Sequence, residues 1–464
     1  AINILVKGHR KGVHIVASLS HTMQRKAFSA AIDVALKRLN KDREKGLLQI
    51  IDLAQKFMGD NFKPEAYEGA KAIVQNPDHK WMKFVNTMLD ELDPNVAKMT
   101  ALNLGFEAAF YGTKTIRKMR QVHHCNIPWL ILMDPTSACN LRCTGCWAAE
   151  YGYKLNLTYE ELDDIVTQGK ELGIYFYMFT GGEPLVRKAD ILKLCKKHHD
   201  VAFHSFTNGT LIDEEWADFF QKYKPRRMNI TLYGADDQAY EQLCHYPGGF
   251  QKTVNAVRLL RDREIDVKIN GSITSKNEED IRKILDIADD LDAAVNLDTY
   301  MYPASRERSK PFDKQSSMNP KDAAMAKKLI FQHQWGEEAL REYQDHVISM
   351  VEDHPQNMQY SRHISCSAGN CSFTINWQGM MRPCVMQSQP EVNVFAEGFQ
   401  RSWEMISAQT KEILINERCI ECKYRPICNT CAAAALLETG DYEGIPEYIC
   451  EYTKEFYKIM KERR

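Results

Sequence analysis

The chain has 464 residues, of which 44% are hydrophobic and 26% charged. This composition is typical of a folded protein of about three domains, and it excludes a disordered, collagen-like or bare coiled-coil chain. With 60 Lys and Arg against 62 Asp and Glu, the net charge is −2, so the chain lacks the overall basic field expected of a nucleic-acid-binding protein. No apolar stretch approaches the roughly 18 residues that a membrane helix needs, and we expect neither a transmembrane segment nor a secretory signal.

The sequence is rich in cysteine, with 14 residues. A chain of this length can bury several hydrophobic cores, so it does not depend on disulfide bonds as small secreted domains do. Without an export signal, we expect a cytoplasmic protein in a reducing environment. There, clustered cysteines are more often metal ligands or catalytic groups.

Residues 1–125 predict a helical domain, because segments such as AFSAAIDVALKRL and KWMKFVNTMLDEL carry apolar residues three and four positions apart. The helix predicted over 97–119 has few charges in its first half. Besides ordinary packing, such a helix can cover the mouth of a barrel or lie on a lipid surface.

From about residue 126, short apolar runs alternate with helix-like segments. Strands are predicted at 129–133, 174–180, 201–206, 227–233, 266–273 and 294–302. Helices are predicted at 158–172, 188–198, 213–223, 249–263 and 277–290. This alternation predicts an α/β fold with a parallel sheet, and six such units indicate an open or partial barrel over residues 126–303. A linker and a helical segment follow over 304–358, and a cysteine-rich domain over 359–464 ends in a charged helix.

A first group of cysteines, Cys139, Cys143 and Cys146, lies in the loop directly after the first predicted barrel strand. Three thiolates in one loop can ligate three irons of a 4Fe–4S cluster, which leaves the fourth iron open to a small molecule. Ligands bind at the carboxyl ends of parallel strands, where this loop is placed. A zinc loop and unligated buried thiols are the alternatives.

The Cys-x3-Cys-x2-Cys spacing followed by Trp147 resembles the signature of the radical S-adenosylmethionine (radical SAM) superfamily. The resemblance implies a partial (β/α)6 barrel, a 4Fe–4S cluster on the three cysteines, and S-adenosylmethionine (SAM) bound at the open iron. It also implies reductive cleavage of SAM to a 5′-deoxyadenosyl radical, with reduced flavodoxin or ferredoxin as electron donor. Trp147 matches the family's aromatic position beside the adenine.

A second motif agrees with this resemblance. Gly181, Gly182, Glu183 and Pro184 end the second strand and match the family's GGEP motif. Its glycines would let backbone groups approach a ligand, and Glu183 can accept a hydrogen bond from the methionine ammonium. Less specific matches to SAM-binding positions are Thr207, Asn208, Thr231, Asn270 and Ser272. For the last three, ordinary polar barrel residues are the alternative. His245 stands where many relatives have Arg, so we predict no Arg–carboxylate contact there.

Eight further cysteines lie near the carboxyl end, at Cys366, Cys371, Cys384, Cys419, Cys422, Cys428, Cys431 and Cys450. Eight thiolates suffice for two fully ligated 4Fe–4S clusters, or for two zinc sites. The block resembles the SPASM-type auxiliary-cluster domain, and Cys366-x12-Gly379-x4-Cys384 fits its opening. The resemblance implies one cluster on Cys366, Cys371, Cys384 and Cys431, and another on Cys419, Cys422, Cys428 and Cys450. Full cysteine ligation favours electron transfer over substrate binding at these clusters.

Three cysteines remain. We expect Cys195 to pack within a helix and Cys125 to lie in a plain linker, with metal binding beside His123 and His124 as the alternative. Cys244, near the fourth strand-helix unit, is placed to approach the active site.

The sequence as a whole predicts a radical enzyme that abstracts a hydrogen atom from an unactivated C–H bond, with three 4Fe–4S clusters and SAM as cofactors. A peptide is the first substrate candidate, and a lipid or other hydrophobic small molecule, with peripheral membrane contact, is the second. An iron–sulfur electron-transfer scaffold is the alternative of another class, but such a protein needs no GGEP motif. A zinc-dependent nucleic-acid binder conflicts with the net charge.

Overall fold

The computed structural model describes residues 2–39, 41–58, 62–91, 93–144, 146, 155–223, 225–300, 317–353 and 360–462. The amino-terminal part is helical, as predicted. Its helices are α1 (Ile2–Leu39), α2 (Arg43–Met58), α3 (Pro64–Val74), α4 (Lys80–Glu91), α5 (Pro94–Thr100), the π-helix η1 (Ala101–Gly112) and α6 (Thr113–His123).

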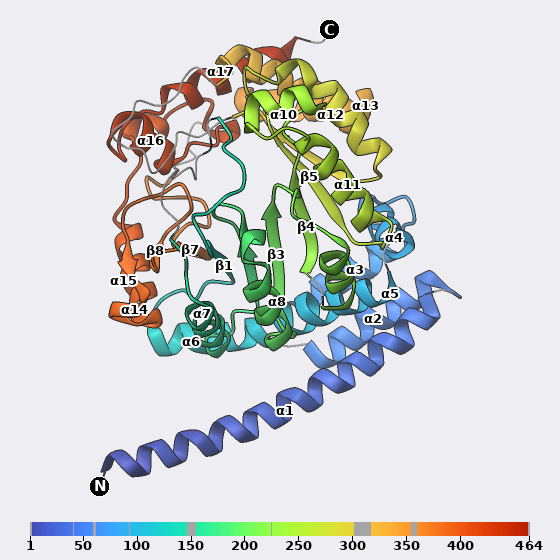
Figure 1. Ribbon diagram of the computed structural model, residues 1–464, viewed down its shortest axis with the longest axis vertical. Coiled ribbons are helices and arrows are strands. Elements are labelled where there is room, and N and C mark those ends of the chain that lie inside the picture. The colour runs from blue at the N-terminus through green and yellow to red at the C-terminus, as the bar shows by residue number, and fades with distance from the viewer. Residues whose placement is uncertain are drawn as a thin grey trace.

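A nine-stranded sheet forms the centre of the molecule, with strand order β6-β5-β4-β3-β2-β1-β7-β8-β9 (Figure 1). The predicted strands are confirmed as β1 (Leu130–Met133), β2 (Phe176–Phe179), β3 (Ala202–Thr207), β4 (Pro225–Thr231), β5 (Val267–Ser272) and β6 (Ala294–Asp298), and neighbouring strands are parallel. The mixed α/β fold with a parallel sheet is therefore confirmed.

The carboxyl-terminal part adds three strands that the sequence did not predict. They are β7 (Ser372–Ile375), β8 (Met380–Arg382) and β9 (Val392–Asn393). β7 pairs in parallel with β1, with Leu130 opposite Ser372, whereas β8 pairs antiparallel with β7 and β9 pairs antiparallel with β8. β1 therefore lies inside the sheet, between β2 and β7.

Helices cover the outer face of the parallel strands. They are α7 (Tyr159–Glu171), η2 (Pro184–Arg187), α8 (Lys188–Lys197), α9 (Glu214–Tyr223), α10 (Asp237–Cys244), α11 (Gly249–Arg261), η3 (Glu278–Asp280) and α12 (Ile281–Asp290). The sequence missed α10. Alternate strand residues such as Ile131, Tyr177 and Ile269 are fully buried in one core with these helices, because side chains alternate between the two faces of a strand.

The remaining residues of each strand point to the other face of the sheet, which we call the inner face. On β1 and β2 the inner face is apolar, with Leu132 paired to Met178. On β4, β5 and β6 it is polar, because Thr231 lies opposite Asn270, which lies opposite Asn296.

The rest of the carboxyl-terminal part is more helical than predicted. Its helices are α13 (Pro320–Glu352), α14 (Val394–Glu397), α15 (Phe399–Lys411), η4 (Glu417–Cys419), η5 (Arg425–Ile427), α16 (Ala432–Thr439) and α17 (Glu447–Lys461). α13 is kinked at Gly336, where φ is 76°. α13 and α17 pack together through buried residues such as Val347 and Met460.

Helix η1 lies against the amino ends of the strands, so it does not cover the carboxyl-end mouth of the sheet. Asn103 donates to the carbonyl oxygens of His199 and Val201, directly before β3, at 3.0 Å each. A Cβ on Gly112 would lie 2.4 Å from the carbonyl oxygen of Gly173, before β2. Glycine at position 112 therefore allows close backbone contact here.

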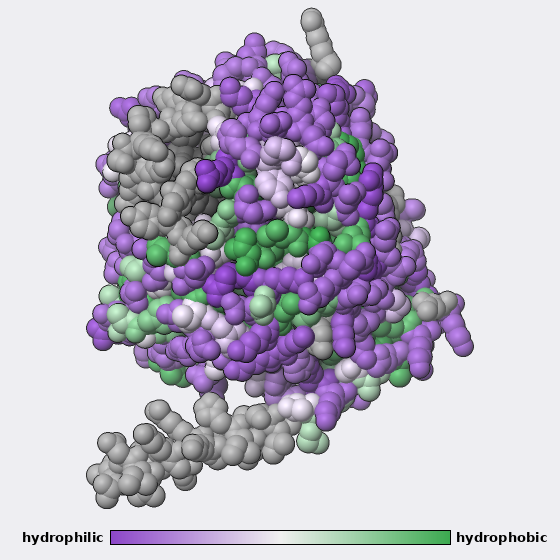
Figure 2. Space-filling view, viewed as in Figure 1, coloured by the Kyte–Doolittle hydropathy of each residue, from purple (hydrophilic) through white to green (hydrophobic). Residues whose placement is uncertain are grey.

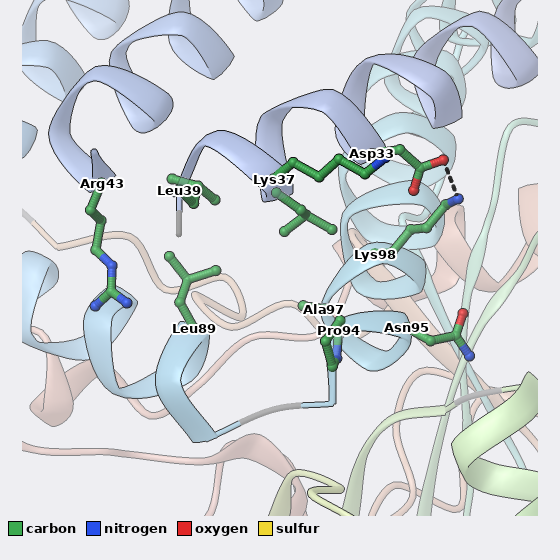
Figure 3. A pocket seen from close by; sticks show the side chains of 10 residues that line it. Asp33, Lys37, Leu39, Arg43, Leu89, Pro94, Asn95, Ala97 and Lys98 are labelled. Carbon is green, nitrogen blue, oxygen red and sulfur yellow. Dashed lines mark hydrogen bonds and ion pairs between the residues drawn. The ribbon is translucent and has the colours of Figure 1, made fainter. Parts of the chain in front are cut away.

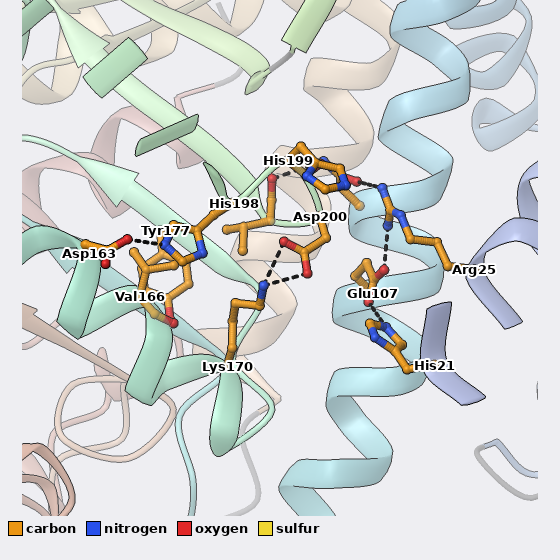
Figure 4. Close-up of polar contacts among 12 residues, drawn as sticks. His21, Arg25, Glu107, Asp163, Val166, Lys170, Tyr177, His198, His199 and Asp200 are labelled. Atoms are coloured by element: carbon orange, nitrogen blue, oxygen red, sulfur yellow. Dashed lines mark hydrogen bonds and ion pairs between the residues drawn. The ribbon is translucent and has the colours of Figure 1, made fainter. Parts of the chain in front are cut away.

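A buried carboxylate joins η1 to α1 (Figure 4). Glu107 has a fully buried side chain and accepts from His21 Nε2 at 2.7 Å and from Arg25 Nη1 at 2.5 Å. Arg25 also donates to Asn103 Oδ1 at 2.8 Å. The network thus links α1, through η1, to the amino edge of the sheet.

A pocket lies among the amino-terminal helices (Figure 3), lined by residues that fall between Asp33 and Lys98, which form an ion pair of 2.6 Å. None of the predicted site residues lines it. In the view of Figure 2 the surface is mostly hydrophilic, with apolar side chains gathered in the middle of the face. Within the described ranges, no helix combines the length and apolar character needed to cross a bilayer.

Candidate active site

The cysteine loop leaves the carboxyl end of β1 and is fastened to the GGEP motif at the end of β2. The Gly182 N–H donates to the Thr136 carbonyl at 2.9 Å, and the Glu183 N–H donates to the Ala138 carbonyl at 2.8 Å. A Cβ on Gly182 would lie 2.3 Å from the Ala138 oxygen. The glycine is therefore required for the approach of the cysteine loop itself, whereas we had expected the approach of a ligand.

The Glu183 side chain points inward and joins β2 to β3. Oε1 accepts from the Leu185 N–H at 2.9 Å and from Thr207 Oγ1 at 2.8 Å, and Oε2 accepts from the Asn208 N–H at 2.8 Å. Burial raises the pKa of Glu183 to about 7, although these three donors oppose the shift. Oε2 accepts only one of these hydrogen bonds and can accept one more.

Asn140, inside the cysteine loop, links that loop to the end of β3. Asn208 Nδ2 donates to Asn140 Oδ1 at 2.9 Å, and Asn140 Nδ2 donates to Thr210 Oγ1 at 2.8 Å. Thr210 in turn donates to Asn208 Oδ1 at 2.7 Å. No local pattern pointed to Asn140 and Thr210, because the bonds that join them to each other and to Asn208 connect different strand-helix units.

The three thiols of the loop lie near one another. Burial raises the pKa of Cys139 to about 12, and the nearby Glu183, Cys143 and Cys146 side chains act in the same direction. The Leu141 N–H donates to Cys139 Sγ at 3.4 Å. Cys139 is nevertheless exposed at the surface, and Cys143 and Cys146 are partly exposed. Clustered, accessible thiols with an N–H donor on one sulfur fit an iron–sulfur cluster, whose positive iron charges stabilise thiolates. Trp147 lies outside the described residues.

Cys143 has a fourth thiol beside it. A hydrogen bond to Cys244, followed by burial, raises the pKa of Cys143 well above its usual value. Cys244 thus approaches the cysteine loop as predicted. His245 also faces this loop, with its Nε2 at 3.3 Å from Thr144 Oγ1.

The polar residues proposed for SAM lie on the inner face, toward the carboxyl ends of β4 and β5. Thr231 and Asn270 are paired neighbours, and Ser272 is exposed at the end of β5. Asn270 Nδ2 is buried without a hydrogen-bond partner in the described part of the chain. A buried amide donor without a partner costs about 1–3 kcal/mol, so this position fits a ligand that accepts a hydrogen bond.

The carboxyl-terminal cysteines fall into two neighbourhoods, and the first contains Cys366, Cys384 and Cys431. Burial raises the pKa of Cys384 to about 12, and the nearby thiols of Cys431 and Cys366 act in the same direction. The N–H groups of Met386 and Gln387 donate to the Cys384 sulfur. The Cys371 Sγ accepts from Asn126 Nδ2 at 3.6 Å.

The second neighbourhood contains Cys419, Cys422, Cys428 and Cys450. Burial, followed by the thiols of Cys428, Cys419 and Cys422, raises the pKa of Cys450 to about 11. Thr453 Oγ1 donates to Cys428 Sγ at 3.6 Å. Across the described ranges, no three Cys, His, Asp or Glu side chains are already arranged around a common metal position.

The remaining cysteines take no part in these groups. Cys195 is buried within α8, where burial raises its pKa. Cys125 is half-buried beside Trp403, and Glu404 and Lys411 are the charged side chains near it. His123 contacts Gln400 and Glu404.

Comparisons with known proteins agree with this geometry. The Radical SAM superfamily model matches residues 133–290. The AdoMet-dependent heme synthase of Methanosarcina barkeri is 23% identical over 334 residues, which cover 68% of this chain and 95% of that protein. The structure of native anSMEcpe with bound AdoMet has a TM-score of 0.58 at 20% identity, over 72% of this chain and 98% of that chain.

A further solved structure, Streptococcus suis SuiB bound to precursor peptide SuiA, has a TM-score of 0.56 at 17% identity, over 74% of this chain and 80% of that chain. Enzymes of this superfamily use a 4Fe–4S cluster and SAM. The matched residues 133–290 contain the cysteine loop and the GGEP motif. The chain therefore carries a radical SAM domain over residues 133–290, followed by a carboxyl-terminal extension, and is an enzyme similar to those of the radical SAM superfamily.

Proposed function

We propose that the chain cleaves SAM reductively and uses the resulting 5′-deoxyadenosyl radical to abstract a hydrogen atom from an unactivated C–H bond. The observation that carries the proposal is the three-cysteine loop at the carboxyl end of β1, fastened through Gly182 and Glu183 to the end of β2. Cys139, Cys143 and Cys146 would hold a 4Fe–4S cluster, which supplies the electron when it is bound and reduced.

The chain's own residues would orient SAM beside this loop. Oε2 of Glu183 has room for one N–H donor, such as the methionine ammonium. Asn270 Nδ2 would donate to the carboxylate or the ribose, which would give this buried amide a partner. Thr207 and Asn208 are committed to Glu183 and Asn140, so their role would be to hold the motif in place.

Further contacts follow from the family resemblance. Gly181 and Pro184 would shape the backbone around the methionine end of SAM. Trp147 would lie beside the adenine. Thr231 and Ser272 would lie near the ribose.

Two auxiliary 4Fe–4S clusters would complete the enzyme. The contacts around Cys384 and around Cys450 bring together three members of the first predicted ligand set and all four of the second. The first cluster would use Cys366, Cys371, Cys384 and Cys431, and the second Cys419, Cys422, Cys428 and Cys450. Reduced flavodoxin or ferredoxin would supply electrons to the clusters.

A peptide is the substrate class that we propose. Two of the structures with the same fold hold a peptide, since SuiB is bound to precursor peptide SuiA and anSMEcpe to a Cp18Cys peptide. The inner face of β4–β6 carries Asn229, Thr231, Lys268, Asn270 and Asn296, whose amide, hydroxyl and ammonium groups match peptide polar groups. The same polar lining argues against a lipid chain, which would leave these groups without partners.

Anaerobic incubation of the reconstituted protein with SAM and dithionite tests the activity. We expect 5′-deoxyadenosine from the native chain and none from Cys143→Ala. Metal analysis should give roughly twelve irons per chain, against two zincs for a zinc protein. A fully reconstituted sample that releases no 5′-deoxyadenosine would refute the proposal. Deuterium transfer from labelled peptide fractions, against lipid fractions, identifies the substrate class.

A further inference from the structure

A thiol outside the cysteine loop contacts the loop's central cysteine. Cys244 is the last residue of α10, is fully buried, and hydrogen-bonds Cys143. Two backbone hydrogen bonds fix this contact on either side of Cys143. The Arg142 N–H donates to the Cys244 carbonyl at 3.1 Å, and the Thr144 N–H donates to the Leu243 carbonyl at 2.8 Å.

A hydroxyl group faces the same sulfur. The Tyr233 hydroxyl hydrogen-bonds Cys143, and the thiols of Cys143, Cys146, Cys244 and Cys139 all lie near the Tyr233 ring. Two hydrogen bonds hold the backbone of Tyr233 in place. Its N–H donates to Tyr240 Oη at 3.2 Å, and its carbonyl accepts from Asn277 Nδ2 at 2.9 Å. The hydrogen bond to Cys244 raises the pKa of Cys143, so the free Cys143 thiol donates to the Cys244 sulfur, whereas the Tyr233 hydroxyl, which lowers this pKa, donates to Cys143. A cluster-bound Cys143 thiolate has no proton to donate, so both neighbouring groups can then act as donors to it.

We propose that Cys244 is a positioning residue for the SAM-binding cluster and that its S–H, together with the Tyr233 O–H, donates to the thiolate of Cys143. This inference rests on the proposed function, because it needs the cluster on Cys139, Cys143 and Cys146. A hydrogen bond to a ligand sulfur withdraws electron density from the cluster and makes the reduced state more accessible. Cys244 would thus raise the reduction potential of the cluster.

The test compares Cys244→Ala, Cys244→Ser and Tyr233→Phe with the native chain after anaerobic reconstitution. Cys195→Ala is the matched control, because Cys195 is an equally buried cysteine in α8, outside the cysteine groups. The midpoint potential of the SAM-perturbed cluster is measured by electron paramagnetic resonance. We expect a more negative potential for Cys244→Ala and Tyr233→Phe, restoration toward the native potential in Cys244→Ser, and no shift in Cys195→Ala.

Two outcomes would overturn the inference. The first is a native potential in Cys244→Ala. The second is a loss of about four irons in Cys244→Ala, because Cys244 would then be a cluster ligand rather than a hydrogen-bond donor. If the proposed function is wrong, SAM would leave the electron paramagnetic resonance spectrum of the native cluster unchanged, so this result can be told apart from the two outcomes above.

The contact itself can be tested without a cluster. Diamide, an azo oxidant, takes two electrons and two protons from a pair of thiols and becomes a hydrazine while the disulfide forms. In cluster-free protein we expect peptide mapping to find Cys143 joined mainly to Cys244, and this disulfide to be missing from the cluster-loaded protein. A predominant disulfide between Cys143 and Cys139 or Cys146 would overturn the contact.

Discussion

Replacing Glu183 by Gln tests the central polar contact of the site. The carboxylate accepts three hydrogen bonds, two at Oε1 and one, from the Asn208 N–H, at Oε2. The Gln carboxamide can place its oxygen where Oε1 lies in the native chain, where it accepts from the Leu185 N–H and from Thr207 Oγ1. Its NH₂ group then faces the Asn208 N–H, and two donors meet.

The cost follows from the loss of that acceptor. A buried N–H left without a partner costs about 1–3 kcal/mol. If local opening of the segment limits exchange, this cost corresponds to about 5- to 150-fold faster hydrogen exchange at the Asn208 amide. Hydrogen exchange with mass spectrometry on a peptide that covers 207–210 measures the change. Glu215→Gln is the control, because Glu215 is an exposed carboxylate at the start of α9 that forms an ion pair with Lys188.

The substitution also changes how stability depends on pH. Burial raises the pKa of Glu183 from 4.5 to about 7. Between these pH values the unfolded carboxyl releases its proton while the folded one keeps it, so stability falls as pH rises through this window. The fall totals about 3 kcal/mol, at 1.36 kcal/mol per pKa unit. Gln cannot titrate, so Glu183→Gln loses this dependence.

Urea unfolding of the cluster-free protein, followed by tryptophan fluorescence at pH 5 and pH 8, measures the effect. We expect the difference in free energy of unfolding between the native chain and Glu183→Gln to shrink by about 3 kcal/mol from pH 5 to pH 8. The reasoning would be refuted if this difference in free energy of unfolding stayed constant with pH, or if the substitution left hydrogen exchange at the Asn208 amide unchanged.

Three other substitutions test separate parts of the structure. Glu107→Gln should destabilise the docking of α1 by about 3–5 kcal/mol, because the part-buried Arg25 then loses its only carboxylate partner among the described residues and keeps the neutral Asn103. Limited proteolysis should then cut α1 faster, and native resistance would contradict the ion pair. Gly182→Ala should abolish loading of the SAM-binding cluster, because its Cβ would meet a backbone oxygen at 2.3 Å; Gly69→Ala, where a Cβ meets nothing within 4 Å, should load normally, and equal loading would argue against the clash. Cys450→Ala should lower the iron content by about four per chain; iron analysis that finds the native content would remove this residue from the second auxiliary set.

The predicted elements were most reliable where strand and helix alternate. The six strands β1 to β6 were all predicted, because apolar runs of this length bounded by turn residues are a strong local signal, whereas β7, which is also parallel to β1, was not. Helix α10 was missed, because its eight residues, DQAYEQLC, are too few for a clear helical period. The π-helical form of Ala101–Gly112 could not be distinguished from an α-helix by the same pattern.

The candidate site was predictable only where its residues follow one another in sequence. The cysteine spacing and the GGEP motif are such local signals. The bonds from Thr207 and Asn208 to Glu183 join two different strands, and the sequence pattern does not encode such pairings. The link from Asn140 to Asn208 is of the same kind. The domain boundaries and the individual cofactor contacts stay predictions.

The pairing of β1 with β7 has a consequence for how the protein is made. The amino-terminal part of a chain leaves the ribosome first, so Leu130–Met133 emerges long before its neighbour Ser372–Ile375. Until then, the strand that leads into the cysteine loop has one unpaired side, and unpaired strand sides invite association between nascent chains. A shortened version that stops after β6 would keep this open side permanently, so we expect it to aggregate.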